Sequence, residues 1–439
     1  MSRMYIASTV AVLLTSGLAA CGGGPSIPRQ AQMGPDPKLP AANQPLIPAI
    51  HIAPAIGWPA GRRPTAAAGL KVSAFAAGLD HPRWVYTLPN GDVLVAESNG
   101  PPAPIKRPKD LVLHVVDQAA GAATPSAERI TLLRDANGDG VAETRTVFLS
   151  GLHSPFGMAL VGNDLYVADT DALLRYPYVA GETAIRARGV KVADLPAGPI
   201  DHHWTKNVLA SRDGTKLFVS VGSNSNVGEN GLEAEAGRAA IYEVDRASGA
   251  MRPFAAGLRN PNGMGFEPVT GALWAVVNER DELGNDLVPD YFTSVKDGGF
   301  YGWPYSYWGQ HVDRRVRPQR PDLVARAIKP DYGLSSHVAP LGLTFYESNA
   351  LPGYRGGAFI GEHGSWDRQQ LNGYKVVFVP FAGGRPSGLP RDVLTGFLSA
   401  DGRAYGRPVG VSVDRAGALL VADDVGDKVW RVTAASPPR

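Results

Sequence analysis

The segment from Gly78 to Ser98, GLDHPRWVYTLPNGDVLVAES, decides the fold class of this chain. Two runs with alternating apolar residues flank the turn sequence LPNGD, a pattern typical of a β-hairpin. Five further segments repeat this pattern across turns rich in Gly, Asn or Asp. They span residues 151–170, 203–223, 257–279, 339–364 and 406–423. Six hairpins of one kind predict six repeated structural units.

Further predicted strands, such as KVVFVPF at 375–381, lie between these hairpins and bring each unit to about four strands. Four-stranded units arranged radially leave only short, protected edges around a central channel. The sequence therefore predicts an all-β fold, a six-bladed β-propeller over residues 67–435. The spacing of the hairpins is uneven, and the longest insertion, residues 281–337, is expected to cover one mouth of the channel.

Composition excludes several other classes of protein. The chain has 439 residues, 44% of them hydrophobic, which is enough to bury a large core. The net charge is +2 and charges of both signs are interspersed, so no basic stripe suited to nucleic acid is present. We expect no nucleic-acid partner.

The first 20 residues have the layout of a secretory signal, with Arg3, an apolar run and then small residues. The sequence LAAC ending at Cys21 resembles a bacterial lipobox, and Cys21 is the only cysteine. An ordinary signal peptide with a coincidental cysteine is the alternative. We expect a lipid anchor at Cys21 on the periplasmic side of a bacterial membrane, followed by an extended, Pro- and Gly-rich tether over residues 21–66.

Polar side chains come just before the first strand of each repeated unit, where a propeller would gather them at the channel mouth. Such residues often satisfy only the loop backbone, but their number at matching positions favours a pocket for a polar ligand. They are Arg83 beside Trp84, His153, His202, His203, Arg259, Asn260, His337 and Arg407.

Several longer motifs occur in a fixed order between residues 70 and 432. They include GLRNPNGMGF, NERDELGNDLVPDY, FYGWPY, HVAPLGLTFYE and GEHGSWDRQQLNGYKVVFVPF. Together they resemble the sorbosone dehydrogenase group of the soluble sugar dehydrogenases that depend on pyrroloquinoline quinone (PQQ). The resemblance implies a six-bladed propeller, in agreement with the repeats, and oxidation of an aldose or sugar aldehyde to a lactone or acid.

The resemblance implies a role for the histidine pair. Oxidation at a sugar carbon needs a base beside a hydride acceptor, and histidine has a suitable pKa. The family's catalytic histidine matches His203, and His202 is expected to point to the opposite side of an extended segment. The family's orienting aspartate is replaced here by Ser223, which favours an aldehyde or its hydrate, as in sorbosone oxidation, over glucose.

The resemblance also implies a cofactor site. Arg259 would polarise the reacting carbonyl of PQQ and contribute to catalysis, Asn260 would hold the quinone, and Arg407 would bind a PQQ carboxylate. Weaker matches to cofactor-lining positions are His153 and His337. At the position where the family has a lysine beside the cofactor, this chain lacks the lysine and offers His363, Trp366 or Arg368.

A Ca²⁺ ion beside the quinone is implied as well, with ligands among the backbone carbonyls near Arg280, Asp281 and Glu282. The stretch from Asp135 to Thr144 resembles the first half of another calcium loop but has Thr146 at the twelfth position, so an acidic turn is the alternative.

Two other functions stay open at this level: a propeller that binds without catalysis, and a calcium-dependent lactonase. The chain contains no C-x-x-C-H haem motif, so electrons would leave through a separate acceptor, a quinone or a cytochrome.

Overall fold

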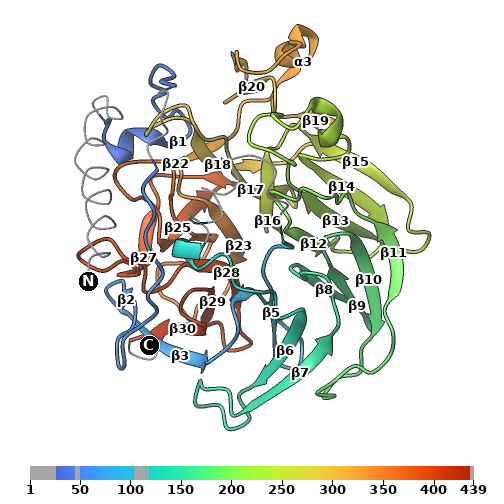
Figure 1. The fold of residues 1–439 in the computed structure, drawn as a ribbon. Coiled ribbons are helices and arrows are strands. Elements are labelled where there is room, and N and C mark those ends of the chain that lie inside the picture. The colour runs from blue at the N-terminus through green and yellow to red at the C-terminus, as the bar shows by residue number, and fades with distance from the viewer. Residues whose placement is uncertain (1–25, 45–49, 103–114, 116–117, 436–439) are drawn as a thin grey trace, which may run out of the picture.

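The structure, a computed structural model, describes residues 26–44, 50–102, 115 and 118–435. Six sheets, each with four antiparallel strands in its blade, are arranged around a central axis (Figure 1). The prediction of a six-bladed β-propeller with four-stranded blades is confirmed. The signal residues 1–20 and Cys21 lie outside the described residues.

The strands of each blade are given from the innermost outward. Blade one contains β4 (Pro82–Thr87), β5 (Val93–Glu97), β6 (Arg129–Arg134) and β7 (Thr144–Ser150), and blade two contains β8 (Met158–Val161), β9 (Asp164–Ala168), β10 (Ala172–Pro177) and β11 (Val190–Asp194). Blade three contains β12 (Lys206–Ala210), β13 (Lys216–Val221), β14 (Ala240–Asp245) and β15 (Met251–Ala256). Blade four contains β16 (Asn260–Phe266), β17 (Leu273–Asn278), β18 (Pro289–Ser294) and β22 (Tyr332–Ser336). Blade five contains β23 (Pro340–Tyr346), β24 (Gly357–Glu362), β25 (Lys375–Ala382) and β27 (Arg391–Thr395). Blade six contains β28 (Pro408–Val413), β29 (Leu419–Asp423), β30 (Lys428–Ala434) and β3 (Leu70–Ala77).

The sixth blade closes the ring, because β3 from the start of the propeller pairs with β30 from its end. The register aligns Val72 with Val432, and both side chains are buried in the core. Closure by distant parts of the chain leaves no open seam between the first and last blades.

The predicted hairpins form the two innermost strands of every blade. Their inner strands pack closely around the channel, and glycine permits this approach. A Cβ atom on Gly263 would lie 2.6 Å from the Leu341 carbonyl oxygen, and one on Gly410 would lie 2.9 Å from the Arg83 carbonyl oxygen. Larger residues at these positions would push neighbouring blades apart.

The predicted insertion over residues 281–337 differs from expectation. It contains β18 and β22, the third and fourth strands of blade four, because buried residues such as Phe292 and Tyr332 make both segments core strands. Only residues 295–331 leave the blade. They carry β19 (Gly299–Phe300), β20 (Ser306–Tyr307), β21 (His311–Val312) and α3 (Pro321–Arg326), and α3 projects at the rim (Figure 1).

The described part of the expected tether packs onto the propeller. β1 (Met33–Gly34) adds to β22, and β2 (Thr65–Ala66) adds to β27. The buried side chain of Gln32 donates to Asp286 at 2.8 Å. Trp58 donates its indole N–H to Asp423 at 2.6 Å. Apolar and hydrogen-bonding side chains within this Pro-rich segment therefore hold it against three blades.

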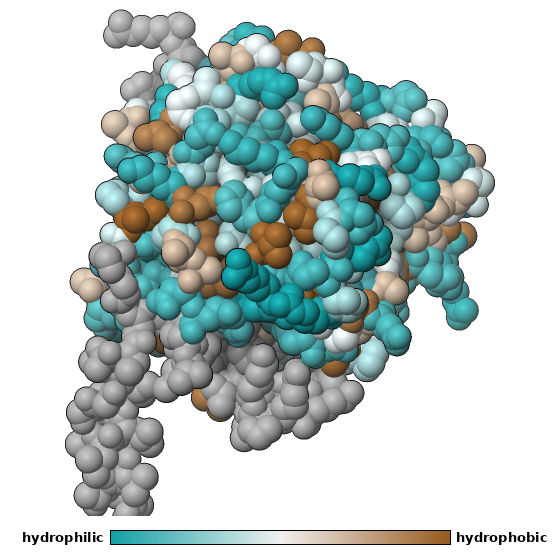
Figure 2. All heavy atoms as spheres, turned by 90° about the horizontal axis from the view of Figure 1, so that it is seen from above, coloured by the Kyte–Doolittle hydropathy of each residue, from teal (hydrophilic) through white to brown (hydrophobic). Residues whose placement is uncertain are grey.

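A view at right angles to that of Figure 1 shows apolar side chains scattered among hydrophilic ones (Figure 2). Large exposed apolar residues such as Val147, Val190 and Val269 lie on different blades or turns. In the described ranges, no helix has the length and apolar character needed to cross a membrane.

Candidate active site

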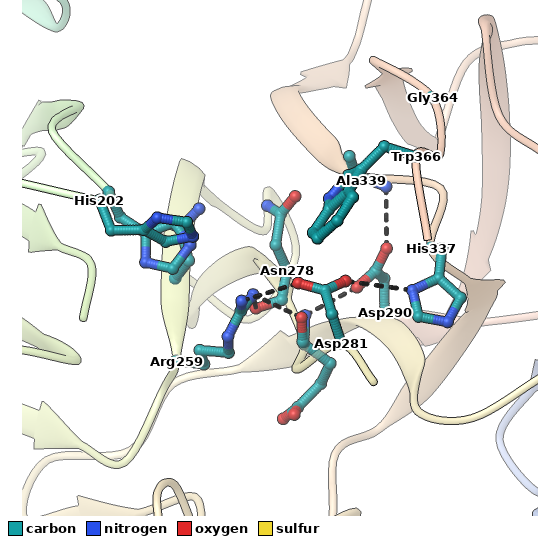
Figure 3. Close-up of a pocket in the computed structure, with 12 residues that line it drawn as sticks. His202, Arg259, Asn278, Asp281, Asp290, His337, Ala339, Gly364 and Trp366 are labelled. Carbon is teal, nitrogen blue, oxygen red and sulfur yellow. Dashed lines mark hydrogen bonds and ion pairs between the residues drawn. The ribbon is translucent and has the colours of Figure 1, made fainter. Parts of the chain in front are cut away.

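A cavity of about 210 Å³ opens where the inner strands of blades three, four and five begin (Figure 3). It brings together five predicted catalytic and cofactor residues: His203, Arg259, Asn260, His337 and Trp366. The full lining consists of His202, His203, Arg259, Asn260, Asn278, Glu279, Asp281, Asp290, His337, Ala339, Gly364 and Trp366.

His203 is held in one tautomer by the residue that follows β13. Its Nδ1 lies 2.9 Å from the Ser223 carbonyl oxygen and 3.0 Å from the Ser223 hydroxyl. The hydroxyl itself donates to the Ser225 carbonyl at 2.6 Å. A carbonyl can only accept, so Nδ1 carries the proton and Nε2 is the basic atom.

Electrostatics keep His203 neutral. Burial lowers its pKa well below the usual value, and the positive charge of Arg259 and the ring of His202 lower it further. The neutral ring is thus the resting form, and it can accept a proton at Nε2.

His202 also lines the cavity, and its ring meets that of His203 edge to face, with centroids 4.6 Å apart. The expectation that His202 points to the opposite side is wrong, because both residues lie in a turn before β12 and not in an extended strand. Strand alternation does not apply to a turn.

Arg259 is buried in the wall of the cavity, with its guanidinium fully engaged. It donates to the Asn226 side-chain oxygen at 3.0 Å and to Asp281 Oδ2 at 3.0 Å. It also donates to the carbonyl oxygens of Asn226 and Glu279. These contacts fix the position of its charge in the wall of the cavity that His203 also lines.

Asp281 lies between Arg259 and His337 and interacts with both (Figure 3). His337 Nδ1 is 3.3 Å from Asp281 Oδ1, and Nε2 is 3.1 Å from the Gly284 carbonyl oxygen. Burial lowers the pKa of His337, but the hydrogen bond and charge of Asp281 outweigh burial and raise the pKa to about 9. The lining also contains Asp290, whose pKa burial raises to about 7.

The predicted calcium ligands are partly engaged within the protein. The Asp281 carbonyl oxygen accepts from the Asn226 amide at 3.2 Å and from Arg315 at 2.9 Å. Arg280 is absent from the cavity lining, and its fully buried guanidinium pairs with Glu279 and Asp313. Glu282 donates its backbone N–H to Asp367 Oδ2 at 2.6 Å. Asp367 was not predicted, although it follows Trp366 directly.

Arg407 lies beside the cavity and not in its lining. Its Nη2 donates to the Ala53 carbonyl oxygen at 3.1 Å, and its guanidinium stacks 5.1 Å from the centre of the Tyr374 ring. A second group of charges adjoins it: Asp424 pairs with Arg83, and His363 Nε2 lies 2.8 Å from the same carboxylate.

Two other predicted cofactor residues lie outside the cavity lining. His153 is half exposed and sits 3.1 Å from Asp171 in blade two. Arg368 donates to the Ser336 carbonyl oxygen at 3.2 Å and pairs with Asp286 at 3.3 Å. Arg368 is thereby committed to joining the loops that anchor Gln32.

The calcium-like stretch from Asp135 to Thr144 forms an exposed hairpin turn between β6 and β7. Asp135, Asp139 and Glu143 each place a carboxylate oxygen within 4.8 Å of the others. The two oxygens of Asp135 accept from the backbone N–H groups of Gly138 and Gly140 at 2.7 and 2.8 Å. These carboxylates thus serve the backbone of the turn.

Comparison with known proteins adds three findings. A PQQ-dependent pyranose dehydrogenase of Coprinopsis cinerea is 29% identical over 223 residues, which cover 41% of this chain and only 30% of that protein. The solved holo form of the PQQ domain of Coprinopsis cinerea pyranose dehydrogenase superposes with a TM-score of 0.69 at 21% identity, over 87% of this chain and all of that one. A calcium structure of the Trichoderma reesei family AA12 enzyme gives 0.69 at 20% identity, over 88% and 99%.

At these identities the solved structures establish the shared fold alone. A family model described as TrAA12-like matches residues 64–289 and 322–435, which together make up more than half of the sequence. The matched ranges contain five whole blades and most of blade four, whose strand β18 lies almost entirely in the unmatched segment. They contain every residue of the cavity lining except Asp290. The chain therefore belongs to the TrAA12-like family.

Proposed function

We propose that the protein is a PQQ-dependent dehydrogenase that oxidises an aldose or a sugar aldehyde, with sorbosone-like aldehydes as the substrate class. The observation that carries this proposal is the neutral His203, whose Nδ1–H is fixed by Ser223 and whose Nε2 is left as a base beside Arg259. The Coprinopsis cinerea relative, named as a PQQ-dependent pyranose dehydrogenase, supports it.

Buried donors in the charged group around Asp424 fit the carboxylates of PQQ. In the described part of the chain, Arg83 Nε, Arg407 Nε and His81 Nε2 have no hydrogen-bond partner. Unpaired buried donors are costly, and an arginine suits a carboxylate. Arg407 and Arg83 would therefore hold carboxylates of the cofactor, while Asn260, whose side-chain oxygen is also unpaired, would contact the quinone.

PQQ supplies a quinone carbonyl that accepts a hydride. His203 Nε2 would take the proton from the hydroxyl of a cyclic aldose or of an aldehyde hydrate, as a hydride leaves the carbon that carries this hydroxyl. A cyclic aldose would give a lactone, and the hydrate would give an acid. Arg259 would hold positive charge beside the acceptor, in an orientation already fixed by Asn226 and Asp281. Trp366 would form a wall of the substrate space.

A Ca²⁺ ion near Asp281 is part of the proposal, and the calcium structure of the Trichoderma reesei relative supports it. The ion would stabilise negative charge developing on the acceptor. The carboxylates nearest to that position belong to Asp281 and Asp367.

Reconstitution tests the function. Purified protein mixed with PQQ and CaCl₂ should gain the absorbance of bound quinone and reduce an artificial dye when an aldose or sugar aldehyde is added. A lactonase would need the metal alone, and a binding module would reduce no dye. Absence of PQQ binding would overturn the proposal.

Replacing Ser223 with aspartate is expected to move the acid limb of the pH–rate profile to higher pH. The base must be neutral to act, and the lowered pKa of His203 keeps it neutral into acid solution. A carboxylate beside Nδ1 raises that pKa and stabilises the imidazolium formed during the reaction. A charge-assisted hydrogen bond contributes about 1.5–3 kcal/mol, so kcat on the plateau should rise roughly 10- to 100-fold. Ser223→Ala is the control, since it retains the carbonyl acceptor, and an unshifted acid limb in Ser223→Asp would contradict the assignment.

The N-terminal processing is proposed on the sequence alone. Residues 1–20 would be removed and Cys21 lipidated, which would anchor the enzyme to the periplasmic side of the membrane, where it would pass electrons to a quinone or cytochrome. Cys21→Ser should then move the protein from the membrane fraction to the soluble periplasm, as followed by immunoblotting of cell fractions. Wild-type protein that is soluble and carries no lipid would contradict this.

A further inference from the structure

We propose that Asp281, His337 and Asp367 form a side-chain site for one divalent metal ion, and that this site binds Zn²⁺ more tightly than Ca²⁺. The inference rests on the geometry of these three residues and not on the proposed oxidation. It concerns the protein without PQQ, before the oxygens of the cofactor could complete a Ca²⁺ site, and it assigns three side chains as ligands in that state.

The three residues converge from separate loops of blades four and five. Asp281 follows β17, His337 follows β22 and Asp367 follows β24. Each is at least nine-tenths buried, and each places one ligand atom within 4.8 Å of the other two. Two carboxylates and one imidazole at this separation can reach a common ion about 2 Å from each donor atom.

Outer contacts orient each ligand. His337 Nε2 faces the Gly284 carbonyl oxygen at 3.1 Å, so Nε2 carries a hydrogen and Nδ1 is directed to the site. Asp281 Oδ2 is held by Arg259 at 3.0 Å and Asp367 Oδ2 by the Glu282 N–H at 2.6 Å. Metal-binding histidines usually donate their second N–H to a carbonyl or carboxylate in this way.

Charge favours a cation at the same place. The buried carboxyl groups of Asp281 and Asp367 supply the negative charge, and each places an oxygen within 4.8 Å of the other. Arg259 pairs with Asp281 Oδ2 and leaves Oδ1 to the site. Without metal, Nδ1 of His337 shares a proton with Asp281. An ion bound at Nδ1 would replace that proton, as occurs whenever a metal binds imidazole.

The ligand types determine the preferred metal. Without PQQ, the three side chains supply one nitrogen and two carboxylates, and the Asp281 carbonyl oxygen already accepts two hydrogen bonds. The site in this state therefore offers fewer oxygen ligands than the six to eight that Ca²⁺ takes. An imidazole nitrogen suits Zn²⁺ and other transition metals. Three protein ligands beside a cavity leave a further position open towards that cavity, as in catalytic zinc sites.

Calorimetric titration of the full chain, treated with EDTA and free of PQQ, tests the proposal. ZnCl₂ should bind with one ion per chain and raise the Tm, and CaCl₂ titrated separately should bind more weakly. Asp367→Asn and His337→Gln, which preserve side-chain size closely, should each weaken Zn²⁺ binding by at least about 10- to 100-fold. Circular dichroism of the metal-free variants establishes that they fold.

Two matched controls remove metal-binding groups elsewhere. Asp139→Asn alters the exposed acidic turn, and His153→Ala removes the half-exposed histidine; both should bind Zn²⁺ as wild type does. Tighter binding of Ca²⁺ than Zn²⁺ would overturn the proposal. So would unchanged Zn²⁺ affinity in folded Asp367→Asn and His337→Gln. Because no substrate or PQQ is present, this result is separate from the outcome for the proposed function.

Discussion

Replacing His203 with alanine is expected to lower kcat by about 10²- to 10⁴-fold, the usual contribution of a general base. The ring lines the cavity, its Nδ1–H is committed to Ser223, and Nε2 is left to accept the substrate proton. Alanine removes this acceptor without removing Arg259, Arg407 or Asn260. The variant should therefore still bind PQQ, as measured by the absorbance of the bound quinone, while dye reduction is lost.

His202→Ala is the matched control, because it changes the same residue type in the same turn. It removes an edge-to-face ring contact with His203, which is worth about 0.5–1.5 kcal/mol, so its effect on kcat should not exceed roughly tenfold. Equal losses in the two variants, or a normal rate in His203→Ala, would place the base at another residue.

The inner half of each blade could be predicted from sequence because it is local. Each predicted hairpin joins two strands by a short turn, and its Gly, Asn or Asp residues are visible in a window of about 20 residues. The number of these hairpins, six, then indicated the number of blades. The unit at Gly78 to Ser98 became β4 and β5 with the turn at Asn90 and Gly91.

The outer strands and the N-terminal segment depend on distant partners and were harder to predict. β22 joins β18 across an excursion of residues 295–331, so sequence spacing assigned both strands to an insertion. The segment around β1 is rich in proline, which suggested a tether, but Gln32 finds its partners about 250 to 300 residues away. Such pairings leave no local periodic signal.

In the candidate site too, the position of a residue could be predicted from the sequence, whereas the direction of its side chain could not. Residues at the entrance of each inner strand must meet near the channel, and His203, Arg259, Asn260 and His337 do so. The direction of each side chain depends on its neighbours, which explains why Arg368 turns to Asp286 instead. The acid-rich sequences NERDELGND and SWDR contained the only signal for Asp281 and Asp367 as side-chain ligands.

Replacing Arg259 with methionine should have two separable effects. Asp281 and Asn226 would each lose a buried charged donor, and breaking a buried ion pair costs about 3–5 kcal/mol. Loss of a positive charge aimed at the reacting group typically lowers kcat by about 10²- to 10³-fold. Urea unfolding measures the first effect, and dye reduction per PQQ bound measures the second.

Arg252→Met provides the control for loss of an arginine that also forms an ion pair, but at an exposed position. Arg252 pairs with Glu243 and Asp297, but its side chain is 48% exposed, so solvent screens the charges and Arg252→Met should lose far less stability than Arg259→Met. Arg259→Lys retains a charge without the planar fork and should fall between wild type and Arg259→Met. If Arg259 only supports the loop at Asp281, Arg259→Met will be less stable but will turn over normally once loaded with PQQ. A loss of kcat in the folded, loaded variant is the result that assigns Arg259 to the chemistry.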